Sequence, residues 1–310
     1  MSSKGVLRVA LLAGGTSSER EVSLKGAKAV KEALIELGHK VEFFDPAYDL
    51  VKLAQRAKDF DVAFLVIHGP GGEDGTLQGF LEMIGLPYQG AQVLGSALAM
   101  HKGLSKILYE RAGLPVPKGF LFKKEDNKME TIYEVANKLG YPLIVKPATQ
   151  GSSIGLSLVE DSSLLKEALE KAFEIDNEIL LEEYVKGREL TVGVLDDKPL
   201  PVVEILPKSK FFDYETKYIP GMAEEICPAN ISEELTKTAQ NYALKAHKAL
   251  YLRHYSRTDM ILRDNEIFVL ETNTIPGMTE TSLLPLAAKV AGYSFKALIQ
   301  KLLDLALENT

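Results

Sequence analysis

Residues 257–262 read Arg257-Thr258-Asp259-Met260-Ile261-Leu262, and residues 267–273 read Ile267-Phe268-Val269-Leu270-Glu271-Thr272-Asn273. Both runs are rich in apolar and β-branched residues, and the polar stretch 263–266 between them is typical of a hairpin turn. The hairpin brings Asp259, Glu271 and Asn273 to one place. Oxygen ligands without thiols or imidazoles suit Mg²⁺, which takes further ligands from waters and phosphates. We therefore expect the protein to handle a nucleoside triphosphate, with ordinary polar strand ends as the alternative.

A shared metal ion requires that Asp259 and Glu271 lie on one face of the hairpin. Side chains alternate between faces along a strand, so residues that share a face must lie directly opposite each other or two residues apart. A two-residue turn at Asp264-Asn265 would pair Asp259 with Leu270 and place Glu271 on the other face. We therefore predict a three-residue or bulged turn over residues 264–266, which pairs Asp259 with Glu271 and Arg257 with Asn273.

The composition is that of a globular protein with room for two or three domains. The chain has 310 residues, of which 46% are hydrophobic and 25% are charged. A net charge of −7, without a dense basic run, argues against nucleic acid as the main partner. The single cysteine, Cys227, rules out an internal disulfide framework and fits a cytoplasmic location. No apolar run reaches membrane length, so we expect no membrane association.

Strand and helix patterns alternate over the first hundred residues, which is typical of a parallel α/β sheet with helices on both faces. The pattern then changes to two smaller α+β arrangements. We predict an N-terminal α/β unit over residues 1–100, a central unit over 101–184 and a C-terminal unit over 185–310. A long polar segment over residues 207–229 carries four aromatic side chains, which predicts a lid.

Three loops carry groups suited to charged small molecules. Lys146 ends an apolar strand and precedes a glycine- and serine-containing loop, which can place backbone N–H groups and a cation against phosphate oxygens. A hairpin tip with a solvated lysine is the alternative for that loop. Glu19 follows Gly14-Gly15-Thr16-Ser17 and suits an ammonium group, and we expect Ser17 or Ser18 to cap the helix that follows. His68 comes after an apolar strand, where α/β sheets place ligands, and a structural histidine is the alternative.

Three longer motifs, in order along the chain, carry a resemblance to a known family. They are Gly14-Gly15-Thr16-Ser17-Ser18-Glu19-Arg20-Glu21-Val22-Ser23, His68-Gly69-Pro70-Gly71-Gly72-Glu73-Asp74-Gly75 and Glu271-Thr272-Asn273-Thr274-Ile275-Pro276-Gly277-Met278-Thr279. With the segments between them, they resemble the D-alanine–D-alanine ligase family over nearly the whole chain. That family has the ATP-grasp fold. The resemblance therefore implies an α/β protein of three units, with ATP between the central and C-terminal units.

The resemblance also implies a nucleotide and metal site. The phosphates would meet Lys102 and Lys146, and the ribose would meet Glu189. Adenine would lie along the strand that carries Glu182, Glu183 and Val185. The metal ligands would be Asp259, Glu271 and Asn273, in agreement with the hairpin argument. They would hold two Mg²⁺ (or Mn²⁺) ions as cofactors beside ATP, the co-substrate.

By the same resemblance, the substrates are two D-alanine molecules. Glu19 and His68 would hold the first. The second substrate and the developing oxyanion would be surrounded by Arg257, Gly277, Ser282 and Leu283. The phosphate loop and the lid would be linked by Ser152, Lys217 and Tyr218. The implied reaction activates the first carboxylate as an acyl phosphate, which the amine of the second D-alanine attacks while the lid excludes water.

Two rival functions stay open on the sequence. A ligase that joins D-alanine to D-lactate would share the fold, although Tyr218 is typical of the form that uses an amine. A catalytically silent, ATP-binding regulatory protein would have the same fold without catalysing the reaction. This chain, however, retains the lysines and acids of the implied site and Arg257. The resemblance further implies a homodimer and a role in peptidoglycan precursor synthesis.

Overall fold

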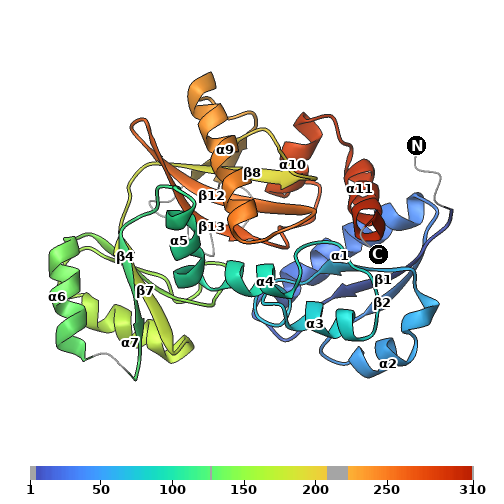
Figure 1. Cartoon of the computed structure of the whole chain (residues 1–310), viewed down its shortest axis with the longest axis horizontal. Coiled ribbons are helices and arrows are strands. Elements are labelled where there is room, and N and C mark those ends of the chain that lie inside the picture. Colours follow the sequence, from blue (N-terminus) through green and yellow to red (C-terminus); the bar gives the residue numbers. More distant parts are fainter. Residues whose placement is uncertain (1–4, 126–127, 208–222, 309–310) are drawn as a thin grey trace.

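The computed structural model describes residues 5–125, 128–207 and 223–308. Three β-sheets lie in a row, and the sheet built from the C-terminal part of the chain lies between the other two (Figure 1). Helices and strands are mixed throughout, so the predicted α/β class is confirmed. Within the described residues, no helix is both long and apolar enough to cross a membrane.

The first sheet is parallel and has the strand order β2-β1-β3. Its elements are β1 (Arg8–Ala13), α1 (Arg20–Glu36), β2 (Lys40–Phe44), α2 (Leu50–Gln55), a 3₁₀ turn (Ala57–Asp59), β3 (Val62–Val66) and α3 (Thr76–Met83). Alternate residues of β1 enter two cores: Val9 and Leu11 face α1, and Ala10 and Leu12 face the side covered by α2 and α3. A strand covered on both faces must be apolar throughout, which explains its continuous hydrophobic run. The parallel sheet predicted for this part of the chain is confirmed.

The second sheet is antiparallel and has the order β4-β7-β5-β6. Its elements are β4 (Gly119–Lys123), α6 (Met129–Leu139), β5 (Leu143–Pro147), β6 (Ser157–Val159), α7 (Leu165–Ile175) and β7 (Glu178–Glu183). Apolar residues at helical spacing, Ile132 and Ala136 on α6 and Leu165 and Leu169 on α7, share one buried core with the strands. Because β5 ends just after Lys146, the glycine–serine loop begins at the edge of this sheet.

The third sheet has the order β11-β10-β8-β12-β13, with β9 beside β8. Its strands are β8 (Arg188–Leu195), β9 (Lys198–Pro199), β10 (Val203–Pro207), β11 (Ala223–Ile226), β12 (Tyr255–Arg263) and β13 (Glu266–Asn273). The remaining helices are α4 (Val93–Met100), α5 (Lys102–Arg111), α9 (Glu233–Ala249), α10 (Leu283–Val290) and α11 (Phe295–Glu308). Part of the segment expected to be a lid is therefore strand β11, while residues 208–222, with Lys217 and Tyr218, lie outside the described residues.

The β12–β13 hairpin has the predicted pairing but not the predicted turn. Asp259 lies opposite Glu271 and Arg257 opposite Asn273, which confirms the pairing. The predicted longer turn is wrong, because Arg263 pairs with Glu266 across a two-residue turn whose first residue has φ 54°. The register shifts inside the ladder instead, where Leu270 is an extra residue between the Met260–Val269 and Asp259–Glu271 pairs. This bulge moves Glu271 onto the face that carries Asp259.

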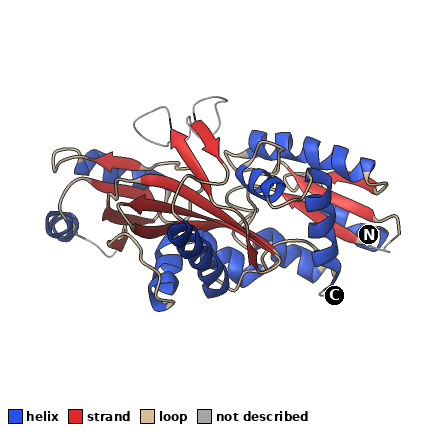
Figure 2. Ribbon diagram, turned by 90° about the horizontal axis from the view of Figure 1, so that it is seen from above, coloured by secondary structure: helices blue, strands red, loops and turns tan. Residues whose placement is uncertain are grey.

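The hydrophobic cores cross the predicted unit boundaries. α11, the helix that leads to the C-terminus (Figure 2), packs against α1 and β3. Its residues Leu298 and Leu302 share a core with strand β1. Ala99 on α4 and Tyr109 on α5 share a core with β8, β12 and α9. The boundaries after residues 100 and 184 stay a prediction, and the packing ties both ends of the chain to the third sheet.

Candidate active site

One cavity of about 720 Å³ is lined by strands of the second and third sheets, by α1 and by loops, among them the loops that follow β1 and β3 of the first sheet. The candidate residues that line it are Glu19, His68, Lys102, Lys146, Ser152, Glu182, Glu183, Val185, Glu189, Arg257, Asp259, Glu271, Asn273, Gly277, Ser282 and Leu283. Lys217 and Tyr218 lie outside the described residues. The fold thus brings together, in one place, every described residue that the sequence analysis singled out.

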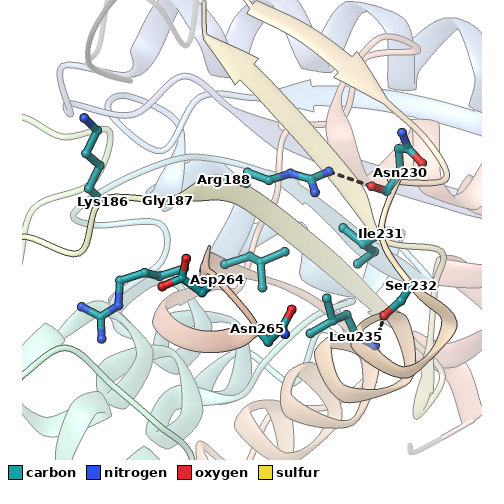
Figure 3. Close-up of a pocket in the computed structure, with 11 residues that line it drawn as sticks. Lys186, Gly187, Arg188, Asn230, Ile231, Ser232, Leu235, Asp264 and Asn265 are labelled. Carbon is teal, nitrogen blue, oxygen red and sulfur yellow. Dashed lines mark hydrogen bonds between the residues drawn. The ribbon is translucent and has the colours of Figure 1, made fainter.

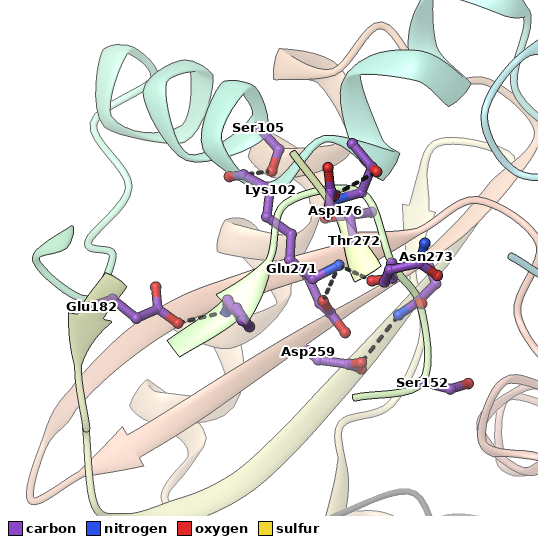
Figure 4. Close-up of polar contacts among 12 residues, drawn as sticks. Lys102, Ser105, Ser152, Asp176, Glu182, Asp259, Glu271, Thr272 and Asn273 are labelled. Carbon is purple, nitrogen blue, oxygen red and sulfur yellow. Dashed lines mark hydrogen bonds and ion pairs between the residues drawn. The ribbon is translucent and has the colours of Figure 1, made fainter. Parts of the chain in front are cut away.

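Two acidic groups of the cavity, Asp259 and Glu271, lie on the β12–β13 hairpin, and cations contact them (Figure 4). Arg257 donates from Nε and Nη2 to the two carboxylate oxygens of Asp259, at 2.9 and 2.8 Å. Asn273 Nδ2 donates to Asp259 Oδ2 at 3.0 Å, and Lys102 Nζ lies 3.4 Å from Glu271 Oε2. Each of the two carboxylates is therefore balanced by a positive side chain.

The donor set fits a metal ion that is bound together with phosphate. Among the described residues, no group of three or more His, Cys, Asp or Glu side chains is placed to hold a metal ion by itself. The hairpin instead supplies two carboxylates, Asp259 and Glu271, opposite each other, and the amide of Asn273. Mg²⁺ is commonly bound by one or two carboxylates and completes its ligands with waters and phosphates. The arrangement therefore fits a nucleotide-borne Mg²⁺ better than a closed protein metal site.

Lys146 lies at the end of β5, in a buried cluster with Glu182 of β7 and Lys106 of α5. Lys146 Nζ is 2.5 Å from Glu182 Oε1, and Lys106 Nζ contacts Glu182 Oε2. Burial acts to raise the pKa of Glu182, but Lys146 and Lys106 outweigh it, so the pKa of this carboxyl is lowered. Burial likewise acts to lower the pKa of Lys146, but the attraction of Glu182 outweighs it and raises the pKa. Both groups are therefore charged at neutral pH.

The loop after Lys146 takes a left-handed backbone conformation. Ser152 has φ 50° and Ser153 has φ 58°, which is uncommon for residues other than glycine. Lys102 Nζ donates to the carbonyl of Gln150 at the start of the loop, and the Ser152 hydroxyl donates to the carboxylate of Glu19. Turns of this kind can aim neighbouring backbone N–H groups at one anion. The geometry thus suits phosphate binding better than a solvated hairpin tip.

Glu19, just before α1, and His68, just after β3, are both buried at the end of the cavity that lies next to the first sheet. Two glycines allow the loops to close on Glu19, since a Cβ at Gly69 or Gly151 would lie 2.7 or 2.6 Å from Glu19 Oε2. Gly69 also has φ +73°, a conformation that side chains rarely adopt. Burial lowers the pKa of His68 despite the attraction of Glu19, and its Nε2 has no hydrogen-bond partner among the described residues. A neutral imidazole next to a carboxylate can orient a zwitterion.

The predicted serine cap of α1 is wrong. Glu19 is the N-cap residue of this helix, and its side chain makes no capping hydrogen bond. The Ser17 hydroxyl donates instead to the carbonyl of His68 at 2.7 Å and accepts from the backbone N–H of Glu19 at 3.3 Å. Ser17 therefore links the His68 loop to the start of α1. Its hydroxyl bonds to a loop that is distant in sequence instead of capping the helix.

Glu73 is a site residue that the sequence analysis quoted in a motif but gave no role. Its carboxylate accepts from the N–H of Gly69 at 2.9 Å and from the N–H of Ile275 at 3.1 Å. It thereby joins the His68 loop to the segment after β13. Burial, together with the charge of Glu19, raises the pKa of Glu73 to about 8. Its position in the HGxxGEDG-like motif was the only signal in the sequence.

A second hollow, of about 880 Å³, lies by the tip of the β12–β13 hairpin and the start of α9 (Figure 3). Its arginines are already engaged: Arg188 donates to Glu204 at 2.6 and 2.7 Å and to the carbonyl of Asn230 at 2.8 Å. Arg263 lies 3.6 Å from Glu266. None of the described candidate residues lines this hollow, so the candidate site is the cavity between the sheets.

The three sheets with their shared cavity form the ATP-grasp fold, as comparison with solved structures shows. The crystal structure of D-alanine–D-alanine ligase from Bacillus anthracis complexed with ATP is 33% identical, covers 98% of both chains and has a TM-score of 0.86. The VanG D-Ala:D-Ser ligase from Enterococcus faecalis is 33% identical, covers 97% of this chain and 100% of its own, and has a TM-score of 0.85.

The chain belongs to the D-alanine–D-alanine ligase family. Residues 108–304 match the family described as D-ala D-ala ligase C-terminus, and residues 45–91 match D-ala D-ala ligase N-terminus. The D-alanine–D-alanine ligase of Syntrophobacter fumaroxidans is 53% identical over 309 residues, which covers 98% of each chain. The resemblance drawn from the three motifs is thereby confirmed.

Proposed function

We propose that this protein uses ATP to join two D-alanine molecules into D-alanyl-D-alanine, through a D-alanyl phosphate intermediate. The observation that carries the proposal is the single cavity, which is lined by the Glu19–His68 pair, the Lys146 loop and the acidic hairpin. A site for a zwitterion, a site for phosphates and a site for a divalent ion must adjoin if a carboxylate is to be phosphorylated. Membership of the ligase family supports the same assignment.

ATP would lie between the second and third sheets. Lys102 and Lys146 would meet its phosphates, and the loop at Ser152 would cover them with backbone N–H groups. Adenine would lie along the strand end at Glu182, Glu183 and Val185, with the ribose at Glu189. The solved structure of the Bacillus anthracis relative is complexed with ATP, which supports ATP as a ligand of this chain.

Asp259, Glu271 and Asn273 would hold Mg²⁺ or Mn²⁺, and the family resemblance implies two ions beside the phosphates. When bound, these ions supply positive charge against the triphosphate. Lys102 and Arg257, which contact Glu271 and Asp259 in this structure, would then be available to the phosphates and to the second substrate.

The first D-alanine would place its ammonium at Glu19 and its carboxylate toward the phosphate loop. Transfer of the γ-phosphoryl group to a carboxylate oxygen then forms the acyl phosphate and releases ADP. His68, buried and neutral, would hold the substrate without adding a competing charge. This step converts a poor electrophile into one that an amine attacks.

The second D-alanine would lie between Arg257 and the loop after β13. A Cβ at Gly277 would lie 3.0 Å from Ser282 Oγ, so the glycine allows this loop to pack closely against Ser282, and Leu283 follows in the cavity lining. The amine attacks the carbonyl carbon, Arg257 and the backbone N–H groups stabilise the oxyanion, and phosphate leaves as the peptide bond forms. Ser152, Lys217 and Tyr218 would link the phosphate loop to a lid that excludes water from the acyl phosphate.

The cellular setting is part of the same proposal and follows the family. It comprises a cytoplasmic homodimer that makes a peptidoglycan precursor, with no nucleic-acid or membrane partner. The D-lactate-using ligase and the silent ATP-binding protein are the alternatives, and the D-Ala:D-Ser neighbour adds D-serine as a second substrate to test.

Purified protein with ATP and Mg²⁺ is expected to release phosphate only when D-alanine is added, and mass spectrometry is expected to identify D-alanyl-D-alanine. Reactions with D-alanine plus D-lactate or D-serine provide the comparison. If a depsipeptide or a mixed dipeptide is the dominant product at neutral pH, the second substrate is D-lactate or D-serine and not D-alanine. Absence of D-alanine-dependent phosphate release would favour a silent binder.

A further inference from the structure

Behind the phosphate site lies a buried lysine that does not reach the cavity. Lys106, on α5 one turn after Lys102, has a side chain that is 7% exposed and is absent from the cavity lining. Its Nζ donates to the carbonyl of Pro117 at 2.5 Å and to Glu182. Burial lowers the pKa of Lys106, while the negative charge of Glu182 opposes that shift and favours the ammonium form.

Glu182 lies between this lysine and Lys146. Its carboxylate is 5% exposed, with one oxygen on Lys106 and the other on Lys146. One carboxylate and two ammonium groups leave the trio with one net positive charge. Lys146 lines the cavity and Lys106 does not, so the net charge is presented to a ligand through Lys146.

This arrangement differs from the other cation pairs of the cavity. Lys102 contacts the carboxylate of Glu271, and Arg257 contacts Asp259. Those two carboxylates are proposed metal ligands, so a bound ion would take over their charge. Glu182 has no such role, and without a second lysine it would form a neutral buried pair with Lys146. A neutral pair attracts a triphosphate far less than a cation does.

We propose that Lys106 is a positioning residue for phosphate binding: it neutralises Glu182 from behind, so that Lys146 keeps its positive charge for the nucleotide. The inference rests on the proposed ATP site and adds a residue that does not touch the ligand. It also explains why a lysine is buried on α5, where desolvation makes an unpaired ammonium costly.

The test compares ATP with adenosine, which lacks the phosphates. Dissociation constants of ATP and adenosine are measured by calorimetry, the latter by competition, for the wild type, Lys106→Met, Glu182→Gln and the double variant. The ratio of the adenosine dissociation constant to the ATP dissociation constant measures how much the phosphates add to binding, and it is insensitive to changes at the adenine. We expect this ratio to fall about tenfold in Lys106→Met, as one charge near the phosphates is lost. We expect the double variant to recover it to within about threefold, because Lys146 then has no carboxylate partner.

The matched control is Lys118→Met, which removes an exposed lysine next to Pro117 and is expected to leave the ratio unchanged. Equal losses of ATP and adenosine affinity in Lys106→Met would indicate a merely structural role and overturn the inference. So would an unchanged ratio, or a double variant no better than the single one. If Lys106→Met does not fold, Glu182→Gln becomes the test. Charge compensation predicts that the ratio does not fall in this variant, and a tenfold fall would overturn the inference. Failure of the proposed function shows separately, as a wild type without D-alanine-dependent phosphate release.

Discussion

Replacing Glu271 with glutamine is expected to lower turnover at least about 100-fold, because the substitution removes one of the two carboxylates that would hold the metal ion. The bulge at Leu270 places this side chain opposite Asp259, and glutamine keeps its shape while losing its charge. Phosphate release with D-alanine measures the effect. Raising the Mg²⁺ concentration is expected to restore part of the activity, since the lost contribution is largely affinity for the ion.

Folding is expected to change little in the Glu271→Gln variant, because the side chain is 24% exposed and lies at the cavity surface. The matched control is Glu266→Gln, at the other end of the same strand, where the side chain is 73% exposed and is not part of the cavity lining. That variant is expected to keep both activity and melting temperature. Wild-type activity in Glu271→Gln at low Mg²⁺ would remove the residue from the metal site.

The sequence was sufficient for the pairing of the hairpin but not for its turn. Alternation between faces requires an extra residue somewhere between Asp259 and Glu271 if both are to share one ion. Turn chemistry around Asp264 and a bulge at Leu270 satisfy that requirement equally. Next to the bulge, the backbone N–H of Val269 donates to the carbonyl of Pro115 at 2.8 Å, a long-range contact that the local sequence does not reveal.

The site residues that the sequence missed are buried charges. Lys106 lies on a helix whose pattern of charges is typical of a solvated face, and only the neighbouring Glu182 and Pro117 carbonyl explain its burial. Glu73 was visible as a motif member, but its bond to Ile275 joins segments about two hundred residues apart. The cores that cross the unit boundaries were missed for a similar reason, since an apolar face predicts burial but does not name its partner.

Acidification below about pH 6.5 is expected to destabilise the protein through two buried histidines. His247 donates or accepts at Ser256 Oγ, 2.7 Å from its Nδ1, and His254 Nδ1 accepts from the N–H of Gly90 at 3.1 Å. Burial lowers the pKa of His247 to about 4. Burial, then the charge of Arg253, lowers that of His254 to about 3. Both side chains are therefore neutral in the folded protein.

The direction of the pH effect on stability follows from comparing these two pKa values with the histidine pKa of about 6.5 in the unfolded chain. Above pH 6.5 neither state binds the proton, and the stability is fully present. As the pH falls from 6.5 toward 4, the unfolded state binds protons first, so the free energy of unfolding decreases. At ~1.4 kcal/mol per pH unit, each histidine should account for about 2 kcal/mol between pH 7.5 and pH 5.0.

Other groups titrate in the same pH range, so the test compares the loss of stability in the wild type with the loss in variants that lack one histidine. Glu73, with its pKa raised to about 8, acts in the opposite direction, because its protonation on acidification favours the folded state. Asparagine can mimic the Nδ1 contact of either histidine, and it tolerates the φ of 64° at His254. Denaturant unfolding of His247→Asn and His254→Asn at pH 7.5 and 5.0 is expected to show a loss about 2 kcal/mol smaller than in the wild type. Equal losses in all three proteins would mean that these imidazoles accept a proton without unfolding.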